Sequence, residues 1–452
     1  MELLIIPTFL LSLFCLYGFT QKPEIAVFVI LLISVVNAWF IELPSIKIGL
    51  NVYLHDAVFI LIFLCALIRI IFMRQYMYIS PLWAIYGIIM FFGLYSGLKL
   101  NGTGAGVDFR AFFYYWVGTL YFMSFSYTKE LLEKVQKNWF WLCFILLGIV
   151  YFRFVAEFLH LPISQTWIGA DSTGVRFRVI NSSQAYLLGV TVIMLFVRYL
   201  LPEAIRPNRV ITILFIVAVV VLQHRSVWAV TIIAVVSAVL LPGVKSTRVL
   251  TNLLVIGIVG FILLLPLLYL GYADKFLGTI SESAEKATNL STGTFGARLA
   301  GWQHIIIYWP QQPFINQAFG DPFGGGYAGM GTAPHNFFFQ SLLRTGLFGT
   351  LIITLFYLLI LGKLYLKIMR HPDNKLYLIL FFMLIIGQMA YYIPYSPMAE
   401  HGILLGIAAS LAKRRIISEE NIKTEIAQNS PYLLNTPFRR NHKSLQSQTI
   451  NN

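Results

Sequence analysis

Three short polar stretches interrupt a strongly apolar chain of 452 residues, and each holds a side chain suited to chemistry. "QHRSVWAV" contains Arg225, "ARLAGWQHIIIYW" contains Arg298, and "GGGYAGMGTAPHNFFFQ" contains His335. A guanidinium stays protonated and makes paired bonds to phosphate oxygens. An imidazole with a pKa near ~6.5 can take a proton from a hydroxyl at neutral pH. Together these groups suit a transfer in which a diphosphate leaves and a hydroxyl attacks.

Further polar side chains come from two other stretches. "GVRFRVINSSQ" contributes Arg176 and Arg178, and "GVDFRAFFYYW" contributes Asp108 and Arg110. If these arginines gather at one depth with few carboxylates beside them, the cavity they line attracts anions. We therefore treat the three arginines as candidate ligands for a diphosphate or a glycan.

The composition indicates that these residues belong to a membrane protein. Hydrophobic residues make up 58% of the chain and charged residues 12%, about half the charge of an ordinary soluble domain. Apolar runs near the ~20 residues that cross a ~30 Å hydrocarbon layer recur along almost the whole chain. We expect an all-α polytopic membrane bundle of about 12–13 transmembrane helices over residues 1–415, with no separate soluble domain.

The spans expected from these runs are the elements that must position the polar stretches. An odd number of spans with a cytoplasmic tail puts the N-terminus outside; the first run is weak, so twelve spans with both ends inside are an alternative. The tail, residues 416–452, is polar and expected to be disordered. The expected spans are approximately 3–19, 25–41, 57–73, 81–97, 111–127, 139–156, 185–200, 210–223, 226–242, 249–270, 347–362, 376–393 and 399–412.

The net charge of +14 mainly reflects how the chain is oriented in the membrane. Lysines and arginines recur in alternate loops, as cytoplasmic loops require, so the charge does not indicate nucleic-acid binding. The remaining connections, 42–56, 98–110, 157–184 and 271–335, then face the outside.

Residues 271–335 form by far the longest of these outward loops. Loops above about 15 residues are uncommon unless they are functional or disordered, and the tryptophans, prolines and glycines here are not a disordered composition. Leu299, Trp302, Ile306 and Trp309 recur at helical spacing. They predict an amphipathic helix along the membrane surface.

Polar side chains lie at both ends of this part of the loop. Arg298 is expected near the N-terminus of the amphipathic helix, where free amides also favour anions. The glycines after Phe323 fit a mobile loop or a close backbone approach, and Pro334 then breaks the chain. His335 and Asn336 are expected at the outer mouth of the next helix.

Each main candidate also has an interpretation without catalysis. Arg298 can be an interfacial arginine whose stem lies in the apolar layer. Arg225 can anchor the topology or a lipid headgroup, although the positive-inside bias disfavours arginine on the outer side. His335 can be a hydrogen-bonded structural residue.

The order of "QHRSVWAV", "ARLAGW" and "APHNFFFQSLLRTGLFG" resembles the O-antigen ligase and polysaccharide polymerase superfamily of bacterial multispan membrane glycosyltransferases. The likeness covers about residues 210–362, an O-antigen ligase-like core that includes the loop 271–335. It implies an inverting, metal-independent glycosyltransferase without cofactor. The donor would be a glycan on a polyprenyl diphosphate such as undecaprenyl diphosphate, and the acceptor a saccharide or lipid A core on the outer leaflet.

The resemblance also implies roles for individual residues. Arg225 and Arg298 would bind the donor diphosphate, and His335 would engage the acceptor hydroxyl, so these three are the catalytic candidates. The secondary candidates, which would bind diphosphate or glycan, are Arg178, Arg176, Arg110, Asn336 and Trp302.

The same resemblance implies a cellular setting. The protein would be a multi-pass component of the bacterial inner (cytoplasmic) membrane, surrounded by membrane lipid, with its active site facing the periplasm or cell exterior. It would serve lipopolysaccharide or exopolysaccharide biosynthesis. Its protein partners would be polysaccharide export or chain-length proteins.

Three alternatives stay open. A ligase joins a finished glycan to a terminal acceptor, whereas a polymerase extends a carrier-linked chain, and both need the same donor site. A transporter of lipid-linked saccharide would instead place ionisable residues near the membrane midplane, whereas the notable polar residues here gather at the outer face. A noncatalytic scaffold would tolerate substitution of the arginines and the histidine.

Overall fold

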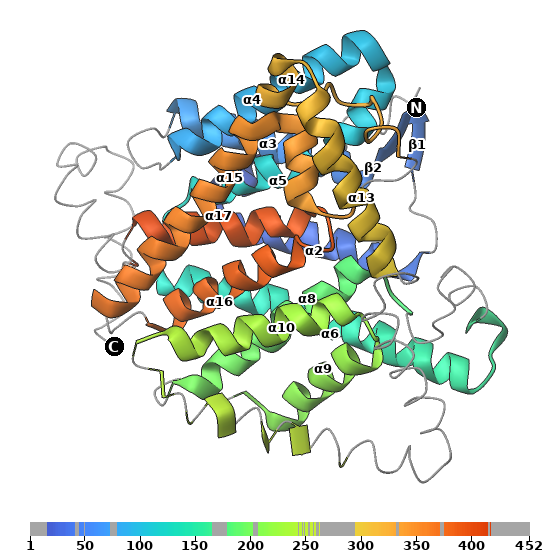
Figure 1. The fold of residues 1–452 in the computed structure, drawn as a ribbon. Helices are drawn as coiled ribbons and strands as arrows, with labels where there is room; N and C mark the ends of the chain where they lie inside the picture. The colour runs from blue at the N-terminus through green and yellow to red at the C-terminus, as the bar shows by residue number, and fades with distance from the viewer. Residues whose placement is uncertain are drawn as a thin grey trace, which may run out of the picture.

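The described part of the chain is a bundle of α helices with one two-stranded hairpin (Figure 1). The computed structural model describes residues 16–40, 45–48, 50–72, 79–164, 179–201, 207–242, 294–330, 334–370, 375–414 and 416, with short pieces between 244 and 262. The prediction of an all-α polytopic membrane bundle is confirmed. The predicted tail, 416–452, lies outside the described residues except for Ile416.

The helices follow the apolar runs of the sequence closely. The long ones are α2 (Pro23–Trp39), α3 (Leu54–Phe72), α4 (Pro81–Asn101), α5 (Thr103–Met123), α6 (Lys129–Phe158), α8 (Ser182–Leu200), α9 (Arg209–Val221), α10 (Arg225–Ser237), α13 (Thr294–Tyr308), α15 (Phe337–Arg370), α16 (Lys375–Tyr391) and α17 (Ala399–Lys413). Short elements are α14 (Phe314–Phe319), η3 (Pro162–Ser164), η4 (Ala238–Leu240) and η5 (Trp309–Gln311). Strands β1 (Ser45–Ile48) and β2 (Leu50–Tyr53) pair antiparallel, with Ser45 opposite Tyr53.

Several helices are long and apolar enough to cross a membrane. Among the described residues these are Leu54–Phe72, Pro81–Asn101, Lys129–Glu157, Ser182–Leu200 and Phe337–Arg370. Shorter apolar helices accompany them, including α2, α9, α10 and α16. The chain is therefore a multipass membrane protein. The total of about 12–13 spans stays a prediction, because most of the expected spans 3–19 and 249–270 lies outside the described residues.

The expectation of an outward loop at residues 98–110 is wrong. Residues 98–110 are almost entirely helical, because α4 continues to Asn101 and α5 begins at Thr103. Gly102 makes the whole turn with a φ of 56°, a left-handed conformation that glycine adopts without steric cost. A single glycine thus joins two helices where the polar composition indicated a loop.

The bundle packs most closely where helix backbones meet through glycines. A Cβ added to Gly406 of α17 would lie 2.7 Å from the carbonyl oxygen of Thr119 in α5, and one added to Gly402 would lie 3.0 Å from the oxygen of Tyr115. Small residues at such contacts let helices approach closely, which is how helices associate in a membrane. This contact fixes α17 against α5 in the centre of the bundle.

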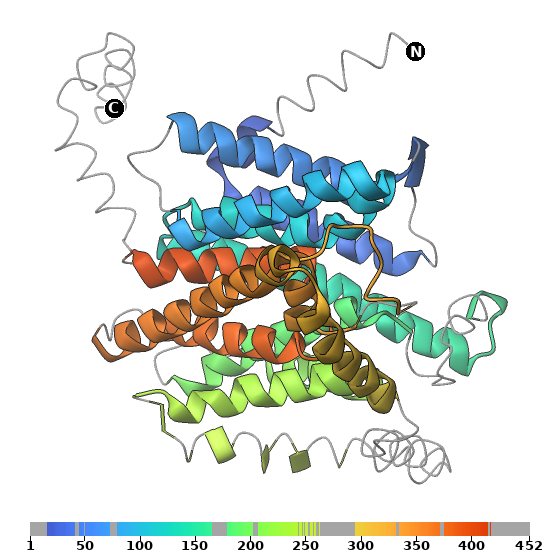
Figure 2. The ribbon, with the colours of Figure 1, turned by 45° about the horizontal axis from the view of Figure 1, so that its top comes forward.

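The helix ends that carry the candidate residues gather at one end of the bundle. In Figures 1 and 2 the β1–β2 hairpin, the C-terminal end of α6 and the N-terminal ends of α8 and α10 lie together, and α13 crosses this end. The C-terminal end of α17 lies at the opposite end.

Candidate functional site

A tight turn between α9 and α10 positions Arg225. Helix α9 ends at Val221 and α10 begins at Arg225, so the predicted two-helix turn is confirmed. The His224 imidazole precedes α10 and lies with its Nε2 2.9 Å from the carbonyl oxygen of Ile180, which attaches the turn to the segment before α8. The partly exposed Arg225 is therefore held at the start of a rigid helix.

Gln223 in this turn is a residue that the sequence reasoning missed. It is 1% exposed, and within the described part of the chain neither its Oε1 nor its Nε2 has a hydrogen-bond partner. Its φ is 52°, which is uncommon for a residue with a side chain. A buried unpaired amide is costly, and such strained positions often lie at functional sites. No sequence pattern distinguishes Gln223 from an ordinary polar turn residue.

Helix α13 positions Arg298 and confirms the predicted helix in the long loop. In the described residues it begins at Thr294, so Arg298 lies close after its first turn, and anion binding beside the free N-terminal amides stays a prediction. The Arg298 guanidinium lies over the ring of Tyr395, 5.4 Å from the centroid. Ile305 of this helix is fully buried, whereas Ile306 of the predicted stripe is 56% exposed.

Trp302 connects α13 to the segment that carries His335. Its indole Nε1 donates to the carbonyl oxygen of Pro334 at 2.9 Å, and its ring stacks on Phe339 of α15 with centroids 5.8 Å apart. The indole N–H is thus already used by the protein. A glycan would have to contact the ring of Trp302 instead.

Asn336 caps the helix that follows His335. Its Oδ1 accepts a hydrogen bond from the backbone N–H of Phe339 at 3.1 Å, and the residue is 5% exposed. This is the usual contact of an N-terminal cap. The contact explains the asparagine at this position structurally, and binding of substrate by Asn336 stays a prediction.

His335 and Arg298 are brought together by these contacts. His335 has a φ of 46° and is exposed, directly before the capping residue of α15. Partial burial lowers the pKa of the His335 imidazole, and the positive charge of Arg298 lowers it further. The imidazole is therefore mainly neutral at pH 7 and able to accept a proton.

Arg225 lies on the same side of the molecule. Figures 1 and 2 both show the N-terminal end of α13, near Arg298, beside the N-terminal end of α10, where Arg225 stands. The helix ends that carry Arg225 and Arg298 therefore lie at one end of the bundle, and convergence of the three candidate side chains on one site stays a prediction. Arg176 and Arg178 lie outside the described residues.

Arg110 contacts protein groups of its own. Its Nε lies 2.9 Å from Asp56 Oδ1, and its Nη2 donates to the carbonyl oxygen of Asn51 at 2.6 Å. Its guanidinium also lies over the ring of Tyr53, 4.8 Å from the centroid. These contacts hold the β1–β2 hairpin against α5. Substrate binding by Arg110 stays a prediction, and Asp56 already neutralises much of its charge.

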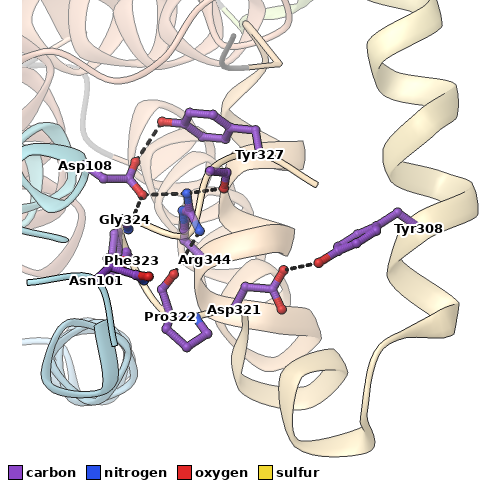
Figure 3. Close-up of polar contacts among 10 residues, drawn as sticks. Asn101, Asp108, Tyr308, Asp321, Pro322, Phe323, Gly324, Tyr327 and Arg344 are labelled. Atoms are coloured by element: carbon purple, nitrogen blue, oxygen red, sulfur yellow. Dashed lines mark hydrogen bonds and ion pairs between the residues drawn. The ribbon is translucent and has the colours of Figure 1, made fainter. Parts of the chain in front are cut away.

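The glycine loop, residues 320–330, lies close against other backbone segments. The expectation of a close backbone approach at its glycines is therefore met. Gly324 has a φ of 81°, and a Cβ there would lie 2.6 Å from the backbone nitrogen of Ala105. Its N–H donates to Asp108 Oδ2 at 3.0 Å (Figure 3). The sequence indicated Asp108 only as a neighbour of Arg110 and missed its partner, Arg344.

Comparison with known proteins adds one match. Residues 210–354, which are 145 of the 452 residues, match the family model described as O-antigen ligase. This segment includes α9, α10, α13 and α14, so Arg225, Arg298 and His335 all lie within it. No curated protein matches the chain.

Proposed function

We propose that this chain, whose residues 210–354 match the O-antigen ligase family model, belongs to that superfamily and transfers a glycan from a polyprenyl diphosphate to a saccharide acceptor. The family supports a membrane glycosyltransferase of polysaccharide biosynthesis. The donor, an undecaprenyl diphosphate glycan, and the acceptor, a saccharide such as lipid A core, are part of the proposal. So are a place in the bacterial inner membrane and a site that faces the periplasm.

One observation carries the proposal more than any other. The imidazole of His335, whose pKa is lowered by partial burial and by the nearby cation Arg298, lies at the end of the bundle where α10 begins with Arg225. An anion-binding group beside a neutral base is what attack of a hydroxyl on a glycosyl diphosphate requires.

The residues divide the reaction between them. Arg225 and Arg298 hold the diphosphate and stabilise the charge that develops on its bridging oxygen. His335 accepts the proton of the acceptor hydroxyl as that oxygen attacks the anomeric carbon. The bond from the anomeric carbon to the phosphate oxygen breaks, and the polyprenyl diphosphate departs with the electron pair. Attack opposite the leaving group inverts the anomeric configuration.

Metal independence is part of the same proposal. Two guanidinium groups can neutralise the departing diphosphate without a divalent ion, since they stay protonated at all relevant pH values and bind two oxygens each.

The test is transfer in proteoliposomes with a defined polyprenyl diphosphate glycan. Two acceptors are offered, a lipid A core and a carrier-linked glycan, and product size is measured. The ligase proposal expects transfer to the lipid A core; elongation of the carrier-linked glycan alone would identify a polymerase.

Matched variants connect the activity to the site. His335→Ala is expected to abolish transfer while donor binding survives, and Arg298→Ala to weaken donor binding. His160→Ala, at an exposed turn after α6, and Arg209→Ala, at the exposed start of α9, are the controls and should behave as wild type. Full transfer by His335→Ala would refute the proposed role of the imidazole.

A further inference from the structure

A buried ion pair joins two apolar helices, α5 and α15. Arg344 of α15 and Asp108 of α5 approach to 2.6 Å, and their side chains are 1% and 10% exposed (Figure 3). Taking two charges out of water is costly, and an apolar pair of similar volume is often equally stable. Helix packing alone therefore does not explain these residues.

Both partners of the pair bind the backbone of the glycine loop. Arg344 donates from Nη1 to the carbonyl oxygen of Pro322 at 3.0 Å and from Nη2 to that of Gly326 at 2.6 Å. Asp108 accepts from the N–H of Gly324 at 3.0 Å and from the hydroxyl of Tyr327 at 2.7 Å. Figure 3 shows these side chains pointing at one another from α5, α15 and the loop. The ion pair thus fixes the loop from two sides.

The glycine loop packs against α15 where that helix is interrupted, so the loop can hydrogen-bond to the helix backbone. Gly346 has a φ of 65° and a ψ of −169°, which interrupts the helix just after Arg344. The N–H of Asp321 donates to the carbonyl oxygen of Leu343 next to this break. A Cβ on Gly320 would lie 2.3 Å from the carbonyl carbon of Arg344, so only glycine fits there.

The loop in turn holds α13. The hydroxyl of Tyr308, the last residue of α13, donates to Asp321 Oδ2 at 3.2 Å. One turn earlier, His304 Nε2 lies 2.6 Å from the carbonyl oxygen of Ala328. Helix α13 is therefore attached at two points to a loop that the ion pair fixes. The same helix carries Arg298, and the chain after the loop leads to His335.

We propose that Asp108 and Arg344 are positioning residues, which hold the glycine loop so that Arg298 on α13 and His335 before α15 keep the spacing that transfer requires. The inference rests on the proposed function. Neither residue contacts the reacting groups, so each acts through the loop and α13.

The test uses a mild variant, Tyr327→Phe, which removes one hydrogen bond from the loop to Asp108 and leaves the ion pair in place. Asp108→Asn and Arg344→Lys are stronger changes, and Tyr95→Phe, on an exposed tyrosine of α4, is the matched control. Full-length protein in proteoliposomes is assayed for transfer from about pH 5 to 8, with turnover and donor KM measured separately.

A positioning role predicts a change that a purely structural role would not produce. Among the described residues, Arg298 is the charged group that acts on His335. If the loop loosens and Arg298 moves away, the pKa of His335 rises, so the acid limb of the rate profile shifts to higher pH. Turnover of folded Tyr327→Phe falls about tenfold, with little change in donor KM.

The outcomes separate this inference from the proposed function. An unmoved acid limb and unchanged turnover in folded Tyr327→Phe would overturn the positioning role, even if Asp108→Asn fails to fold. Under that result, loss of transfer in His335→Ala would leave the proposed function intact. Full transfer by His335→Ala would instead contradict the proposed function. A shift of the acid limb could then not be assigned to the His335 imidazole.

Discussion

Replacing Trp302 by phenylalanine separates two roles of this residue. The indole N–H donates to the carbonyl oxygen of Pro334 at 2.9 Å, and the ring stacks on Phe339. Trp302→Phe removes the hydrogen bond and keeps an aromatic ring on Phe339. It therefore weakens the attachment of α13 beside His335 without removing the helix contact.

The magnitude follows from the contact that is lost. A neutral hydrogen bond contributes about 0.5–1.5 kcal/mol, and the buried carbonyl of Pro334 loses its indole partner. At 1.36 kcal/mol per factor of ten, the population with α13 correctly attached falls by at most about tenfold. The retained stacking, about 0.5–1.5 kcal/mol, limits the loss further. We expect transfer to fall about two- to tenfold.

The assay is transfer turnover in proteoliposomes together with thermal unfolding in detergent. Trp141→Phe, on an exposed tryptophan of α6, is the control and should leave both unchanged. Trp302→Ala, which also removes the stacking, should lower turnover more and reduce the melting temperature. A loss of about a thousandfold in folded Trp302→Phe would refute this reasoning, because it would mean that the indole N–H contacts substrate in the transition state.

Four other predictions follow from the site. Arg225→Lys should lower transfer at least about tenfold, since an ammonium cannot make the paired bonds of a guanidinium to diphosphate; wild-type turnover would remove that argument. Because the pKa of His335 lies below its ordinary ~6.5, transfer should persist as pH falls to that value and be lost only below it; an acid limb above pH 7 would contradict this. A chelator should leave transfer intact, and rescue of lost activity by a divalent ion would rule out the metal-independent mechanism. Gln223→Met should raise the melting temperature, because it replaces a buried amide that has no hydrogen-bond partner among the described residues by a side chain of similar size, and a lower melting temperature would indicate a partner for that amide.

The helices could be predicted from the sequence because their signal is local. An apolar run determines a membrane helix by itself, and the turn before Arg225 is visible as a short polar break between two such runs. The one-residue turn at Gly102 could not be recognised, since polar residues on either side of it resemble a loop.

Contacts between distant segments have no comparable signal. Arg344 lies in a polar break of the apolar pattern of α15, but nothing near it in the sequence points to Asp108 on α5. The hairpin at residues 45–53 was missed although Ile46, Ile48, Leu50 and Val52 alternate, because membrane helices dominated the pattern. The residue types and the family resemblance suggested that Arg298 and His335 act together, whereas the contacts that hold them, through Trp302 and the glycine loop, required the structure.

The central claim is that α10 and α13 bind one diphosphate beside His335. The most direct measurement is photo-crosslinking with a polyprenyl diphosphate glycan that carries the photoreactive group next to its diphosphate, followed by mass mapping of the labelled peptides. A shared diphosphate site predicts label in both "QHRSVWAV" and "ARLAGW", lost from both when unlabelled donor competes. Label confined to other segments, or present in one of the two stretches and insensitive to competition, would contradict it.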